Sequence, residues 1–108
     1  QGEAAFRAQE TQTLADLGKQ SGLVIATGGG CVTREENYDL LHQNGTVFWL
    51  TRELNKLPTQ GRPLSRDLGQ MYARREPMYR RFADAAVSND GSVEQTVREI
   101  RRIWEENL

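Results

Sequence analysis

Apolar positions along the chain form short runs and helical stripes that alternate. Two runs rich in β-branched and aromatic residues, 23–27 and 46–50, have the length and composition of buried strands in a parallel sheet. A weaker run spans residues 83–88. Stripes at helical spacing lie before, between and after these runs, over residues 1–20, 33–43, 66–82 and from 92 onward.

The alternation of strands and helices predicts an α/β fold with right-handed crossovers and a parallel sheet. We expect three strands and four helices in a single partial domain over residues 1–108. No strand precedes the first helix, so the pattern is that of a doubly wound domain whose N-terminal strands are missing. Residues 51–65, with two prolines and a glycine, predict a turn of helix and then a mobile loop.

Local signals predict where helices start and bend. Thr33 with Glu36 forms a capping box for the second helix, and Ser92 with Gln95 forms one for the last. Pro77 should kink or restart the third helix, because its nitrogen has no hydrogen to donate. The apolar stripes of the first and last helices comprise Phe6, Leu14 and Leu17, and Val93, Val97, Ile100 and Trp104.

The first apolar run ends in three consecutive glycines, Gly28, Gly29 and Gly30. Without a Cβ atom, glycine lets backbone N–H groups approach a ligand closely. In open α/β sheets, ligands bind just beyond the carboxyl ends of the strands. The glycine run therefore predicts a ligand loop, and an ordinary strand-to-helix turn is the plainer interpretation.

Composition narrows the possible functions. A net charge of -1 argues against a general nucleic-acid or membrane binder. Cys31 is the single cysteine, which excludes a disulfide framework or a cysteine metal cluster. No apolar run reaches the length of a membrane span and no signal peptide is visible, so we expect a cytoplasmic protein.

Arginine supplies most of the positive charge. Six of the chain's arginines lie between residues 62 and 81, and such clusters suit bidentate binding of phosphate or carboxylate. Outside the cluster, Arg7 lies three residues before Glu10, on the same face of the first predicted helix. This carboxylate can orient the guanidinium group; the alternative is a surface ion pair of about 0.3 kcal/mol.

Four motifs occur in order over nearly the whole chain: Gly2–Arg7 followed by Glu10, Ile25–Val32, Gly61–Leu64 and Arg74–Tyr79. Together they resemble the shikimate kinase family, P-loop kinases related to nucleoside monophosphate kinases. The resemblance implies a P-loop kinase-like parallel sheet with flanking helices. It also implies phosphoryl transfer from ATP, with Mg²⁺, to the 3-hydroxyl of shikimate.

The resemblance implies roles for single residues as well. Arg7, oriented by Glu10, and Arg75 would bind the carboxylate of shikimate, while the backbone of Gly28–Gly30, chiefly Gly29, contacts the ring. Arg62 would be the catalytic arginine of a lid over residues 54–66, which closes over the ATP phosphates. Asn89 lies in the loop expected near adenine. No metal ligand is expected among these residues.

One motif of the family does not occur: the 108 residues contain no G-x-x-x-x-G-K-[ST] sequence. The phosphate loop, its magnesium-binding hydroxyl and the first strands are therefore expected upstream, in a fused or associated segment. The chain would then be a C-terminal portion that binds shikimate weakly and is inactive alone. Alternatives are a gluconate or nucleoside monophosphate kinase relative, a non-catalytic remnant or regulatory module, and a site completed by another chain.

Overall fold

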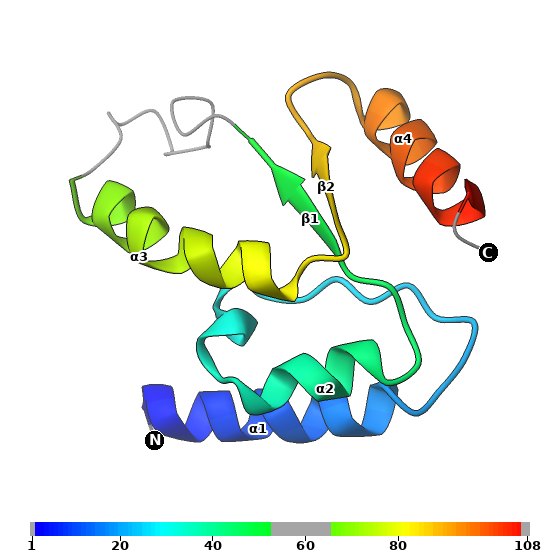
Figure 1. Cartoon of the computed structure of the whole chain (residues 1–108). Coiled ribbons are helices and arrows are strands. Elements are labelled where there is room, and N and C mark those ends of the chain that lie inside the picture. Colours follow the sequence, from blue (N-terminus) through cyan, green and yellow to red (C-terminus); the bar gives the residue numbers. More distant parts are fainter. Residues whose placement is uncertain (1, 53–65, 107–108) are drawn as a thin grey trace. The chain divides into compact units, whose positions relative to one another are not determined.

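The computed structural model describes residues 2–52 and 66–106, and the chain divides into two compact units, Gln1–Val47 and Phe48–Leu108 (Figure 1). In the described residues, four α-helices and a parallel strand pair are present, as the α/β prediction requires. Two of the three predicted strands occur in them, and the first, predicted at residues 23–27, does not. None of the described helices is long and apolar enough to cross a membrane.

The first unit consists of two helices and a short turn: α1 (Glu3–Leu17), the 3-10 helix η1 (Gly29–Thr33) and α2 (Glu36–His42). The two α-helices lie side by side and run in the same general direction (Figure 1). Gly18 allows their close approach, because a Cβ atom there would lie 2.4 Å from the carbonyl oxygen of Leu40. Leu14, Cys31 and Val32 form the buried apolar positions of this unit.

The prediction of a buried strand at residues 23–27 is wrong. This segment has no regular secondary structure, and Leu23, Val24 and Ile25 are exposed. A strand needs a neighbour for its backbone N–H and C=O groups. Within the described residues of the first unit, no other strand is available to pair with it.

Two details of the predicted helices are also wrong. Phe6, which we expected in the core on the apolar stripe of α1, is exposed, whereas Leu14 is buried. Thr33 does not cap α2; its hydroxyl donates instead to the carbonyl of Gly30 at 2.6 Å, and Glu35 takes the N-cap position. The local bond within η1 has replaced the predicted capping bond.

The second unit is built on two parallel strands, with the elements β1 (Phe48–Thr51), α3 (Arg66–Phe82), β2 (Ala85–Ser88) and α4 (Val93–Glu106). The strands pair from Phe48 with Ala85 to Thr51 with Ser88. Phe82 and Val87 are almost fully buried. Helix α3 reaches the sheet through Tyr79, whose ring stacks on Trp49 with centroids 5.7 Å apart.

Helix α3 continues through Pro77 without restarting, and the kink, the other predicted outcome, stays a prediction. Proline removes one helical N–H donor, while the neighbouring turns keep theirs. The expected burial of the second apolar run is incomplete, because Leu50 is exposed. The stripe on α4 is present, yet Val93, Val97 and Trp104 are exposed.

The capping box of α4 is confirmed. The Ser92 hydroxyl accepts from the Gln95 N–H at 3.1 Å, and the Gln95 side-chain oxygen accepts from the Ser92 N–H at 2.9 Å. Asn89 lies just before this cap, and its N–H donates to Thr51 at 2.7 Å, which extends the bonding of the strand pair. The turn between β2 and α4 is thus fixed at both ends.

We expect Ser92→Ala to lower the free energy of unfolding by about 0.5–2 kcal/mol, because the first turn of α4 loses its cap. Urea unfolding followed by far-UV circular dichroism measures the change. Ser92→Thr keeps the hydroxyl and is the matched control. An alanine variant as stable as the original protein would show that this capping box does not stabilise the helix.

Candidate functional site

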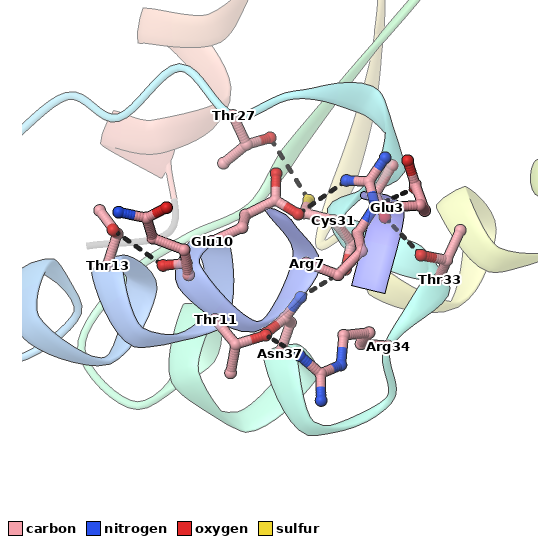
Figure 2. A network of polar contacts seen from close by, with 12 residues as sticks. Glu3, Arg7, Glu10, Thr11, Thr13, Thr27, Cys31, Thr33, Arg34 and Asn37 are labelled. Carbon is pink, nitrogen blue, oxygen red and sulfur yellow. Dashed lines mark hydrogen bonds and ion pairs between the residues drawn. The ribbon is translucent and has the colours of Figure 1, made fainter. Parts of the chain in front are cut away.

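The candidate site of the first unit is centred on the guanidinium group of Arg7 (Figure 2). Its Nη1 atom donates to Glu10 Oε1 at 2.8 Å, so the predicted pairing of these residues is confirmed. Both side chains are largely buried, with 15% and 13% of their surface exposed. Partial burial removes the pair from solvent screening and distinguishes it from an ordinary surface ion pair.

A second carboxylate binds the same guanidinium group. Nε of Arg7 donates to Glu3 Oε2 at 2.7 Å, and Glu3 remains 73% exposed. The hydrogen bonds to Glu3 and Glu10 raise the pKa of Arg7 above its ordinary value, so the side chain stays charged. Sequence reasoning missed Glu3, although its position four residues before Arg7 on a helix is a recognisable signal.

The glycine loop lies directly against this guanidinium group. A Cβ atom built on Gly30 would fall 2.3 Å from Nη2 and 2.6 Å from Nη1 of Arg7, so no larger residue fits without moving the arginine. A Cβ atom on Gly28 would lie 3.4 Å from Glu10 Oε2, an ordinary contact distance. The structure thus brings together four of the predicted site residues.

Gly29 lies between these two glycines at the start of η1 and is exposed, whereas Gly30 is buried. An exposed glycine has no side chain over its backbone, so the N–H and C=O groups of Gly29 are accessible to a ligand. The loop therefore presents its middle residue outward and uses its last residue to pack against Arg7.

Buried hydrogen bonds hold this loop in place. Asn37 of α2 is fully buried, and its Nδ2 atom donates to the carbonyl of Cys31 at 2.7 Å. The hydroxyl of Thr11 on α1 accepts from Arg34 Nη1 at 3.2 Å, which joins α1 to the start of α2. Nothing in the sequence indicated the role of Asn37, because its acceptor is a backbone group.

Cys31 is buried, and its sulfur lies 3.5 Å from the hydroxyl of Thr27. Burial raises the pKa of the thiol above its ordinary value, so the protonated form is favoured at neutral pH. The thiol therefore packs in the interior of the first unit as part of η1. Because a protonated thiol is a poor nucleophile, we assign Cys31 no catalytic role.

The other predicted site residues belong to the second unit or lie outside the described residues. Arg75 is half-buried on α3, and it forms no ion pair with a described carboxylate. Its binding of the ligand carboxylate together with Arg7 stays a prediction. The side-chain oxygen of Asn89 accepts from the Thr96 hydroxyl at 2.7 Å and so joins the loop to α4. Arg62, with residues 54–65 of the predicted lid, lies outside the described residues.

Arg102 of α4 provides an internal comparison for Arg7. It also pairs with two glutamates, Glu99 and Glu106, and its N–H groups donate to both. All three side chains are roughly half exposed, at 54%, 43% and 60%. Two carboxylates on one arginine are therefore not sufficient to mark a site; burial and the adjacent glycine loop distinguish Arg7.

Comparison with known proteins gives a consistent result. The model of a family described as "Shikimate kinase" matches residues 1–105. The shikimate kinase of Chromohalobacter salexigens is 38% identical over 101 residues, covering 83% of this chain and 56% of that protein. The shikimate kinase of Halorhodospira halophila is 37% identical over 116 residues, covering 97% and 64%.

Solved structures extend the likeness to the fold. A shikimate kinase from Acinetobacter baumannii in complex with shikimate aligns with a TM-score of 0.79 at 26% identity, over 98% of this chain and 66% of that one. One from Bacteroides thetaiotaomicron gives a TM-score of 0.72 at 23% identity, over 96% and 68%. The chain spans little more than half of the first curated relative's length.

We expect Gly30→Ala to displace the Arg7 guanidinium group from Glu10 with little loss of fold, because the obstructing atoms are the far end of a flexible side chain. The ¹⁵N–¹H resonance of Arg7 Nε in a labelled protein reports this displacement. Gly28→Ala is the matched control, since its Cβ atom has room and its φ of -71° suits any residue. An unchanged Arg7 resonance in Gly30→Ala would contradict the packing described here.

Proposed function

The chain belongs to the shikimate kinase family, and on this premise we propose that it forms the acid-binding part of an enzyme that phosphorylates the 3-hydroxyl of shikimate from ATP. The observation that carries this proposal is the partly buried Arg7, held by Glu10 against the glycine loop. The likeness to a structure described as a complex with shikimate supports the same substrate.

In this proposal Arg7 binds the carboxylate of shikimate. Guanidinium and carboxylate groups match in a bidentate geometry, which fixes the orientation of the acid as well as its position. Glu10 holds the arginine in a set direction, so less conformational freedom is lost when the ligand binds. The backbone of Gly29, which is exposed and precedes Gly30 in the loop, would contact the ring.

Arg75 would supply a second contact to the carboxylate from α3. Two arginines on one carboxylate would orient the 3-hydroxyl toward the phosphate donor, and positioning is a large part of phosphoryl-transfer catalysis. Arg62 would neutralise charge on the ATP phosphates, and Asn89 would lie near the adenine. The Asn89 side-chain oxygen already accepts from Thr96 and its N–H donates to Thr51, which leaves its side-chain NH₂ group and its carbonyl as the groups to offer.

We assign no Mg²⁺ ligand to the part of the chain that the structure describes. No group of three or more His, Cys, Asp or Glu side chains that could hold a metal ion occurs in that part. The 108 residues also contain no phosphate-loop sequence. We therefore derive no step through Mg²⁺ and assign the phosphate loop and the Mg²⁺ ligands, though not the contacts of Arg62 and Asn89, to polypeptide other than these residues.

We expect the 108-residue chain to bind shikimate and Arg7→Met to weaken that binding about 10- to 100-fold, the usual effect of losing a charge-assisted hydrogen bond. Isothermal titration calorimetry measures both dissociation constants. Arg102→Met is the matched control, because it also removes an arginine held by two glutamates on a helix. Equal binding by the original protein and Arg7→Met would contradict the site.

We also expect the chain, mixed with ATP, Mg²⁺ and shikimate, to form no phosphorylated product at ordinary kinase rates. The physical reason is that its sequence offers no loop of backbone amides and lysine to hold the phosphates. A coupled assay for ADP release gives the measurement. Turnover at ordinary rates would contradict the assignment of this chain as the acid-binding part alone.

A further inference from the structure

Glu3 is the component of the Arg7 site for which the proposed function gives no role. Its carboxylate accepts from Nε of Arg7 at 2.7 Å while its side chain is 73% exposed. Glu10, the other carboxylate on the same guanidinium group, is only 13% exposed. The two glutamates, both labelled in Figure 2, therefore differ strongly in the exposure of their ion pairs with Arg7.

The geometry of a guanidinium group limits how a ligand carboxylate can bind it. A bidentate carboxylate uses two parallel N–H donors, from Nε with Nη2 or from Nη1 with Nη2. Nη1 already donates to Glu10, which is only 13% exposed, so the edge formed by Nη1 and Nη2 is occupied. The edge formed by Nε and Nη2 remains, and its Nε is the atom that Glu3 holds.

The two glutamates differ in how easily they can be displaced. An exposed pair four residues apart on a helix gains little, because water screens the charges and the long side chains lose freedom. Glu10 packs against Gly28 and is largely buried. If Glu10 separated from Arg7, its partly buried charge would have no partner, which costs free energy. Glu3 is therefore the carboxylate that a ligand can replace.

We propose that Glu3 is an internal stand-in for the ligand carboxylate, holding Nε of Arg7 in the absence of ligand and giving way when a carboxylate ligand binds. This proposal rests on the proposed function, because it takes shikimate as the incoming acid. Glu3 keeps the guanidinium group in its binding orientation and neutralises it, at the cost of competing with the substrate. Glu10 orients Arg7 in both states.

The test measures the dissociation constants of shikimate and of its neutral methyl ester for the original chain, Glu3→Gln and Asp16→Asn. Asp16→Asn removes the same charge from an exposed position on α1, about 20 Å along the helix. We expect Glu3→Gln to bind shikimate about two- to fivefold more tightly, the range for an exposed ion pair. The methyl ester should show no such gain, and Asp16→Asn should match the original protein.

The direction of the change separates competition from a structural role. A glutamate in the first turn interacts favourably with the positive N-terminal end of the helix dipole. The loss of this interaction in Glu3→Gln slightly destabilises α1, and by itself this change would weaken shikimate binding. Weaker or unchanged shikimate binding in Glu3→Gln, or an equal gain for the ester or in Asp16→Asn, would overturn the proposal. Absence of shikimate binding by both the original chain and Glu3→Gln would instead overturn the proposed function on which it rests.

Discussion

The ion pair between Arg7 and Glu10 is the interaction on which the rest of the candidate site depends. Both charges are largely withdrawn from water, so each needs the other to remain there. The pair forms on one helix without any loop between its members, because a spacing of three residues places them on one face. Gly30 then packs against the guanidinium group, and this contact is why the loop must end in glycine.

Helix packing in the first unit sets the distance between the arginine and the glycine loop. Arg7 moves with α1, whereas the loop is tied to α2 through the buried amide of Asn37 and the carbonyl of Cys31. Gly18 lets the two helices approach at their far end, and the bond from Arg34 to Thr11 joins them nearer the site. Gly18 and these hydrogen bonds thus position a charged group within a unit whose described residues form no strand.

The comparison of Arg7 with Arg102 shows what makes an ion pair functional in this chain. Both arginines bind two glutamates at helical spacing, and local sequence does not distinguish them. Only Arg7 is shielded from solvent and faces a loop without side chains. Shielding strengthens the interaction of a charge with a ligand, while the exposed glycine at position 29 provides the approach.

The sequence alone determined the helices, the parallel strand pair, the pairing of Arg7 with Glu10, the capping box at Ser92 and, through its motifs, the family. These features depend on neighbours a few residues away or on patterns in the chain itself. Tertiary structure decided that residues 23–27 form no strand, that Phe6 is exposed and that Gly30 meets Arg7. A strand and a buried side chain both need partners that are distant in sequence. A local residue pattern shows that a segment could pair or be buried, but it does not show whether another segment packs against it.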